Sequence, residues 1–223
     1  NRYGIFPAFS AGWVLSKEDF LSSSDVISLL KLRASWGKTG NAEIGNFASR
    51  DLWNAASYKQ LPAIEPAQPE SPNLTWEKSS QTDIGLDFGV FNNRVSGEID
   101  FYNKKTNGLL FYQNIPYTSG YCNIYRNIGD MKNTGFEIVI NTQNIKKDNF
   151  TWDTNFNVAK NNNEITALPD DNRDQIIGNV IRRVGERLDS FYLVEYAGVD
   201  PNNGDALFYK NTLNTSLPVI MNY

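Results

Sequence analysis

The sequence predicts an all-β protein, an antiparallel meander of long strands joined by connections of very unequal length. Three observations lead to this fold class. Apolar and polar residues alternate with a period of two over several stretches, which is typical of strands with one face in water. Tight turns alternate with long loops as the connections between these stretches. Aromatic residues, which strands favour, make up 13% of the 223 residues.

Six stretches share this alternation. They cover residues 9–15, 30–36, 82–91, 95–102, 136–141 and 150–158. In an antiparallel sheet, one face is predicted to carry the apolar set Ile84, Leu86, Phe88, Val95, Ile99, Phe101, Phe136, Ile138, Trp152 and Phe156. The opposite face is predicted to carry Asp83, Asp87, Glu98, Asp100, Glu137 and Asp153. A register slip of one residue would reverse every side chain, so the assignment is sharp.

The connections predict the topology. Residues 92–94 and 144–149 are tight turns, and 17–28 is of moderate length. Residues 37–80, 104–133 and 161 onward are long stretches without regular structure. We expect both tight turns at one end of the sheet and loops 41–73 and 105–132 at the other. The one helix-like stretch is 17–30, with Ser24 or Asp25 as possible caps, and its helical signal is weak: it would form a turn or two at most.

Two architectures fit this pattern. Alternation alone is equally compatible with a soluble antiparallel sandwich and with the wall of a transmembrane β-barrel. Two details favour the barrel. The strands are about ten residues long, whereas sandwich strands usually have about 5–6. The acidic polar face suits a water-filled lumen as well as an exposed sheet.

Composition argues against several function classes. The chain contains no histidine, which removes His-based triads and the usual imidazole metal sites. Its one cysteine, Cys122, permits no internal disulfide and has no histidine to activate it. The net charge of −4 is unsuited to nucleic acid. We therefore predict no catalytic residue, no cofactor and no metal site. Residues 200–205 resemble a calcium loop but are predicted to form a turn between two strands.

Aromatic residues supply the remaining candidates. Those in the long loops are candidates for stacking on sugar rings, although packing on neighbouring loops is the more common role of such residues; they are Trp53, Tyr58, Tyr117, Tyr121 and Tyr125. Trp13, Trp36 and Trp152 belong to the apolar sets of their strands. They are interpreted either as anchors at a membrane interface or as ordinary core residues.

Several local phrases resemble the SusC/RagA family of TonB-dependent outer-membrane proteins. They are FPAFSAGWVLSKEDF (6–20), LLKLRASWGKTGN (29–41), PNLTWEKSSQTDIGLDFGVFNNRVSGEIDFYNKKTNGLL (72–110), NIGDMKNTGFEIVI (127–140) and VGERLDSFYLVEYAGVDPNNGDALFY (184–209). They occur in the family's order and spacing. The resemblance covers the chain to about residue 210, whereas the tail after Tyr209 does not match it.

The resemblance implies a function and a setting. Such proteins are barrels of about 22 strands around a plug. They import glycans or peptides across the outer membrane of Bacteroidetes-type bacteria, with a SusD-like lipoprotein as lid and the TonB complex as energy source. Residues 1–223 would then form part of the C-terminal half of that barrel, without the plug, the early strands or the final strands, and would not be an enzyme. No signal peptide is visible, and no apolar run reaches the roughly 20 residues of a spanning helix.

Two further expectations follow from this assignment. An isolated piece of barrel wall would expose its apolar face to water, so we expect it to require detergent or to self-associate. The alternative function is a soluble β-sandwich that binds carbohydrate or acts as an adhesive module.

Overall fold

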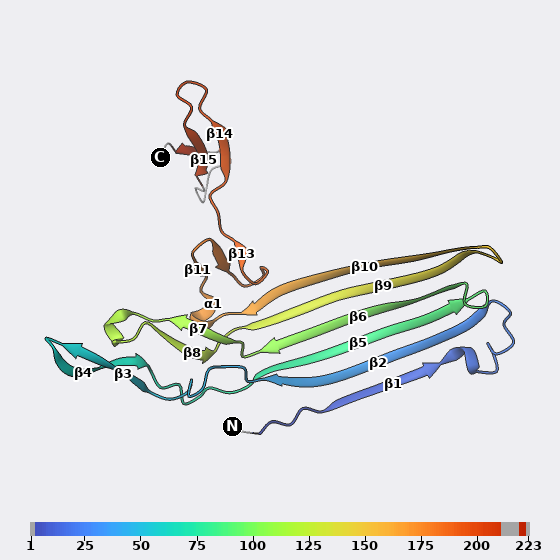
Figure 1. Cartoon of the computed structure of the whole chain (residues 1–223), viewed down its shortest axis with the longest axis horizontal. Coiled ribbons are helices and arrows are strands. Elements are labelled where there is room, and N and C mark those ends of the chain that lie inside the picture. Colours follow the sequence, from blue (N-terminus) through green and yellow to red (C-terminus); the bar gives the residue numbers. More distant parts are fainter. Residues whose placement is uncertain (1–2, 211–218, 222–223) are drawn as a thin grey trace.

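The central element of the protein is one six-stranded antiparallel sheet (Figure 1). The computed structural model describes residues 3–210 and 219–221. The strands of the main sheet, in spatial order, are β1 (Ala8–Val14), β2 (Ile27–Asn41), β5 (Glu77–Val90), β6 (Val95–Asn107), β9 (Asp130–Lys147) and β10 (Phe150–Ala167). All five pairings are antiparallel, and each joins strands consecutive within the sheet, so the predicted meander of six strands is confirmed.

The register confirms the predicted facing of the side chains. Residues directly opposite each other in an antiparallel pair lie on the same face. One such row runs Leu32, Leu86, Ile99, Ile138 and Val158 across five strands. We call this side the apolar face. The adjacent row contains Lys31, Asp87, Glu98, Val139 and Asn157 and lies on the other side, the polar face.

The two ends of the sheet differ as predicted. At the turn end, residues 91–94 join β5 to β6 and residues 148–149 join β9 to β10. Asn92 and Asn93 adopt left-handed backbone angles, which asparagine tolerates better than most residues. The two long connections leave the sheet at its opposite end, which we call the loop end (Figure 1). The expected arrangement of turns and loops is therefore confirmed.

The long connections have more regular structure than the sequence predicted. Each contains a hairpin, formed by β3 (Leu52–Tyr58) with β4 (Leu61–Gln68) and by β7 (Leu110–Asn114) with β8 (Asn123–Asn127). Pro62 and Pro66 lie within β4, which is possible because the two-stranded ribbon leaves one side of each strand unpaired. A short 3₁₀ helix, η2 (Tyr117–Ser119), lies between β7 and β8.

The weakly helix-like stretch 17–30 forms turns and no α-helix: the Leu21 and Ser22 N–H groups donate to the Glu18 carbonyl, the 3₁₀ turn η1 (Leu15–Lys17) lies at its start, and β2 already begins at Ile27, which pairs with Val90. Pairing with the neighbouring strand outweighs local helix preference here. The polar stretch after residue 161 is not a loop but continues β10, because Asn161, Asn162 and Asn163 extend the ladder with β9.

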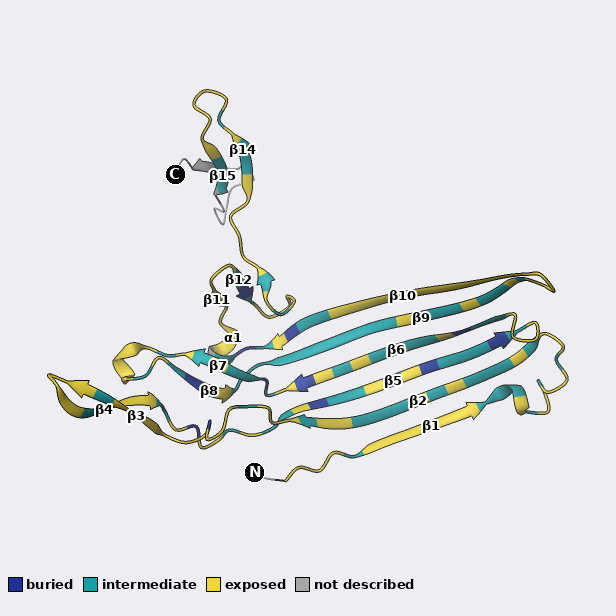
Figure 2. Cartoon of the chain, in the orientation of Figure 1, coloured by how far each residue is buried: buried dark blue, intermediate teal, exposed yellow. Residues whose placement is uncertain are grey.

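The rest of the chain forms small elements beyond the loop end. They are α1 (Pro169–Asn172), β11 (Gln175–Ile177), β12 (Val180–Arg182), β13 (Ser190–Phe191), β14 (Tyr196–Val199), β15 (Ala206–Lys210) and β16 (Val219–Met221). Residues 200–205 connect β14 to β15, so the predicted turn between two strands is confirmed. Ile165, Leu168 and Ile181 are buried where β10 meets these elements, while much of the main sheet is exposed or half-buried (Figure 2).

Candidate functional site

The polar face carries a cluster of charges centred on Arg33 of β2. The Arg33 guanidinium donates to Asp87 Oδ1 of β5 at 2.6 Å and to Asp100 Oδ2 of β6 at 3.0 Å. Glu98 Oε2 lies 3.7 Å from the Arg33 guanidinium, and Lys31 forms a second ion pair with Asp87 at 3.3 Å. One arginine thus links three strands. The ion pairs of the cluster compensate charges that are half-buried on the polar face.

A glycine makes this link possible. Gly85 of β5 lies directly opposite both Arg33 and Asp100. A Cβ at Gly85 would collide with Asp100 Oδ1 and would lie only 2.8 Å from Arg33 Cζ. The guanidinium therefore reaches across β5 because that position has no side chain.

The same arrangement occurs on the next strands. Tyr102 of β6 lies over Gly135 of β9, and its hydroxyl donates to Asn161 Oδ1 of β10 at 3.0 Å. A Cβ at Gly135 would lie 2.6 Å from Tyr102 Cζ. The polar face is therefore braced across strands at two places, each above a glycine.

The apolar face is uncovered. Among the described residues, no second sheet or helix packs on it, and large side chains such as Ile84, Phe101 and Phe156 are each more than half exposed. Neighbouring rings on this face contact each other: Phe9 stacks on Trp36 with centroids 6.0 Å apart, and Phe101 contacts Phe136 at 6.3 Å. A contiguous exposed apolar surface of this kind marks an interaction with a partner or a membrane.

The apolar band crosses the strands at a slant. At the loop end its last members are Trp36 on β2 and Val158 on β10, and Val158 lies in the row of Leu32. The boundary thus moves about four residues over four strand spacings, which corresponds to a slant of ~35°. At the turn end it moves in the same direction, from Trp13 on β1 to Trp152 on β10. Strands of outer-membrane barrels tilt by about 35–45°.

The three tryptophans therefore lie at the borders of the band. Trp13 and Trp152 mark the turn-end border and Trp36 the loop-end border. Trp13 Nε1 donates to Glu18 Oε1 at 2.8 Å, so the polar atom of the ring points to the polar side of the border. This placement favours membrane-interface anchoring over core packing.

The five loop aromatics lie on the two hairpins at the loop end, and the structure brings two of them together. Asp51 accepts hydrogen bonds from Trp53 Nε1 at 3.0 Å and from the Tyr121 hydroxyl at 2.8 Å. The hydrogen bond to Asp51 raises the pKa of Tyr121 above its ordinary value. The β3–β4 hairpin is thereby fastened to the β7–β8 hairpin.

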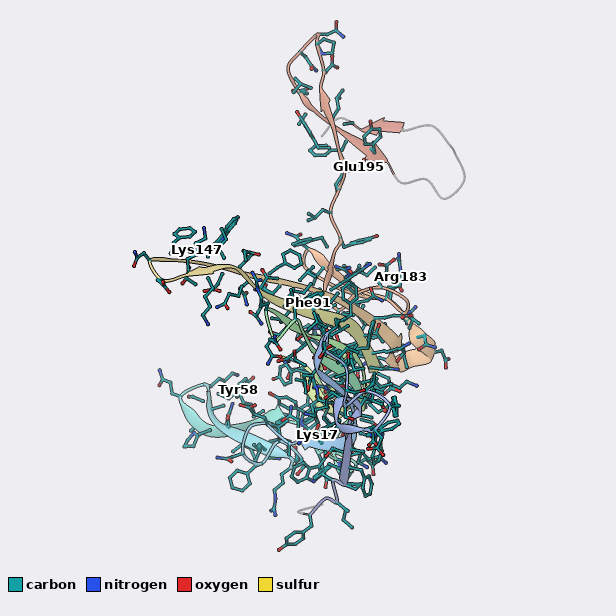
Figure 3. The ribbon with its side chains drawn as sticks, turned by 90° about the vertical axis from the view of Figure 1, so that its right-hand side faces the viewer. Lys17, Tyr58, Phe91, Lys147, Arg183 and Glu195 are labelled. Atoms are coloured by element: carbon teal, nitrogen blue, oxygen red, sulfur yellow. The ribbon has the colours of Figure 1, made fainter. Side chains whose placement is uncertain are left out.

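The other three loop aromatics are separate from this link. Tyr125 packs against Tyr112 with ring centroids 4.7 Å apart. Tyr58 and Tyr117 are 68% and 81% exposed, and Tyr58 projects from the tip of its hairpin (Figure 3). The Lys59 ammonium lies 5.7 Å from the centroid of the Tyr58 ring. The structure therefore divides the set into packed rings and largely exposed rings.

Asn127 completes the junction between the hairpins. Its side-chain amide donates to the carbonyl oxygens of Thr75 at 2.8 Å and Gly108 at 3.0 Å, and it accepts from the Thr75 N–H at 2.6 Å. The buried Ser71 hydroxyl donates to the Tyr125 carbonyl at 2.7 Å. A hollow with a mixed polar and apolar lining remains here, formed by residues 70–74, 124 and 126–128.

Sequence reasoning missed the charge cluster and the hairpin junction. The glycines Gly85 and Gly135 within alternating strands were its only signal, since a strand glycine often marks a close approach. Asp51 and Asn127 lay in connections that the sequence left without regular structure. In the described part of the chain, no helix is long and apolar enough to span a membrane, and no group of three or more potential metal ligands occurs.

A family model for the TonB dependent receptor-like beta-barrel matches residues 1–213. The chain belongs to the TonB-dependent receptor β-barrel family. This is a family of outer-membrane β-barrels, and the relatives include SusC-like transporters, so the resemblance found in the sequence is confirmed.

Curated relatives and solved structures agree with this assignment. The chain is 38% identical over 226 residues to TonB-dependent receptor SusC of Bacteroides thetaiotaomicron and 36% identical over 212 residues to TonB-dependent receptor P3 of Formosa agariphila. These matches cover 92% and 89% of the chain but 22% and 21% of the relatives. The structure of the RagAB peptide importer in its open-open state matches with a TM-score of 0.89 and 32% identity. That match covers the whole chain and 24% of the RagAB chain, so the chain spans about a fifth to a quarter of its relatives' length.

Proposed function

We propose that this chain forms adjacent wall strands of an outer-membrane transporter and that it has no enzymatic role. The observation that carries the proposal is the single sheet with two unlike faces. One face bears an uncovered apolar band at a barrel slant, and the other bears braced charges suited to a wet lumen. A soluble sandwich would need a second sheet against the apolar face, and none lies there among the described residues.

The transporter is proposed to import glycans or peptides, energised through the TonB complex and assisted by a SusD-like lipoprotein. The names of the relatives support this: one is SusC, and another belongs to a RagAB peptide importer. The loop end then faces the cell exterior and the turn end the periplasm, because barrels of this type have long extracellular loops and short periplasmic turns.

The exposed ring faces on the hairpins are proposed to contact the incoming substrate. Tyr58 and Tyr117 are the most exposed of the five, whereas Trp53, Tyr121 and Tyr125 hold the hairpins in position. In the full-length transporter, Tyr58→Ala with Tyr117→Ala is expected to weaken substrate binding about ten-fold without lowering the melting temperature. Phe9→Ala removes an equally exposed ring from the apolar face and should leave binding unchanged.

Cys122 offers a direct test of orientation. It is exposed in the connection between β7 and β8 at the loop end. A membrane-impermeant maleimide added to intact cells should label the full-length protein at this residue, as read by mass spectrometry of the peptide that contains it, and Cys122→Ser should remove the label from that peptide. In the Cys122→Ser background, Asp148→Cys in the β9–β10 turn should react only after the outer membrane is permeabilised. Labelling of Asp148→Cys in intact cells would contradict the proposed orientation.

A further inference from the structure

Beyond the apolar band, the loop end of the apolar face is rich in lysine. Lys38, Lys105 and Lys132 lie in one row with Ser80 and Glu164 across five strands. Two more lysines lie on the same face near this row: Lys78, one same-face position from Ser80 and opposite Gly40 on β2, and Lys160, two same-face positions from Glu164 and opposite Phe136 on β9. We call these five residues the lysine belt.

The lysines of the belt form no ion pairs within 4.0 Å in the described part of the chain and outnumber the carboxylates around them. Only two carboxylates share this region of the face on the described strands, Asp130 and Glu164, and Asp130 already accepts the Gly108 N–H at 3.0 Å. The belt therefore carries excess positive charge.

The centre of the belt is unfavourable in the protein alone. Lys105 and Lys132 are directly opposite each other on neighbouring strands. Like charges in this position destabilise a sheet unless an anion compensates them. At the turn end of the same face, the described strands carry one lysine, Lys147, so the excess is confined to one border of the apolar band.

We propose that the lysine belt binds the phosphates of a phosphorylated glycolipid in the outer leaflet of the membrane. This inference rests on the proposed placement of the sheet in the outer membrane, which puts the belt at headgroup level on the lipid-facing side. The acyl chains would lie on the apolar band below the belt, in the row of Leu86, Ile99 and Ile138. Ammonium groups on flexible stems suit phosphates at several positions, and Trp36 lies 5.8 Å from the Lys38 ammonium at the border.

The test uses the full-length transporter in three forms: wild type, the triple variant Lys38→Gln, Lys105→Gln, Lys132→Gln, and Lys104→Gln. Lys104 is the matched control, because it adjoins Lys105 but lies on the polar face, in the row of Gln81 and Asn133. Each protein is incubated with bis-phosphorylated lipid A in detergent, and bound lipid is counted by native mass spectrometry. The triple variant should retain at least roughly ten-fold less lipid than the wild type, whereas Lys104→Gln should retain as much lipid as the wild type.

Two readouts separate the possible failures. The triple variant should reach the outer membrane. Without lipid A its heat stability should be close to that of the wild type, because removal of the repulsion between Lys105 and Lys132 offsets the loss of Lys132 opposite Glu164 and of the Lys38 contact with Trp36. Equal lipid retention by the triple variant and the wild type would overturn the proposal. Two other results would also overturn it: the wild type binding dephosphorylated lipid A as well as lipid A, or the triple variant losing a bound acidic protein subunit while keeping its lipid. Failure of the wild type to enter the outer membrane would contradict the proposed function itself.

Discussion

Arg33 on β2 donates a hydrogen bond to Asp100 on β6, although β5 lies between the two strands. The contact passes over Gly85, whose missing side chain leaves room for the guanidinium. Tyr102 reaches Asn161 over Gly135 in the same way. Both braces lie on the polar face, where they restrain neighbouring strands from the side opposite the apolar band. In a barrel wall, such contacts would stiffen the lumen surface without placing charge in lipid.

Filling the space over β5 should break the first brace. In the full-length transporter, Gly85→Ala is expected to lower stability by about 1–3 kcal/mol, because the new methyl group meets Asp100 and Arg33. Gly12→Ala is the matched control: Gly12 lies in the same row, and its Cβ would find nothing closer than 3.5 Å. The temperature at which the folded band disappears in semi-native gel electrophoresis measures both variants. Equal loss in the two would show that the space above Gly85 has no special role.

The hairpin junction should depend on pH through Tyr121. Its hydrogen bond to Asp51 raises its pKa above the ordinary value of 10.0, so the folded state favours the protonated hydroxyl. The contribution of this contact is fully present below pH 10 and is lost as the pH rises through the higher folded value. The difference in tyrosinate absorbance between wild type and Tyr121→Phe should have a midpoint above pH 10. Asp51→Asn should bring that midpoint back toward 10, and an unchanged midpoint would contradict the assigned cause.

The isolated chain should not remain monomeric in plain buffer. Its apolar face exposes large side chains over several strands, and soluble monomers rarely expose an apolar patch beyond a few hundred Å2. We expect association through Leu86, Phe88, Ile99 and their neighbours, reversed by detergent. Sedimentation velocity with and without detergent measures this directly. A detergent-free monomer with those side chains exposed would show that the face is not a barrel wall.

The sequence was sufficient for the sheet and its facing because the period of two survives in each strand. From Ile84 to Val90 the alternation alone places every side chain correctly, and the paired asparagines at 92–93 locate the turn. It was insufficient where the alternation ends. Asn161–Asn163 have no apolar partners, yet backbone pairing with β9 keeps them in the strand. The Arg33–Asp100 link depends on three strands at once, so no local pattern could predict it.

The alternation of environments along β6 tests the central claim most directly. In a background with Cys122→Ser and every other cysteine of the full-length transporter replaced, single cysteines at residues 98–101 are spin-labelled in lipid bilayers. Collision rates with oxygen and with a polar nickel reagent are then measured. Ile99→Cys and Phe101→Cys should favour oxygen, as lipid-facing positions do, whereas Glu98→Cys and Asp100→Cys should favour the nickel reagent. Shielding of positions 99 and 101 from both reagents would show instead that the apolar face is buried against protein.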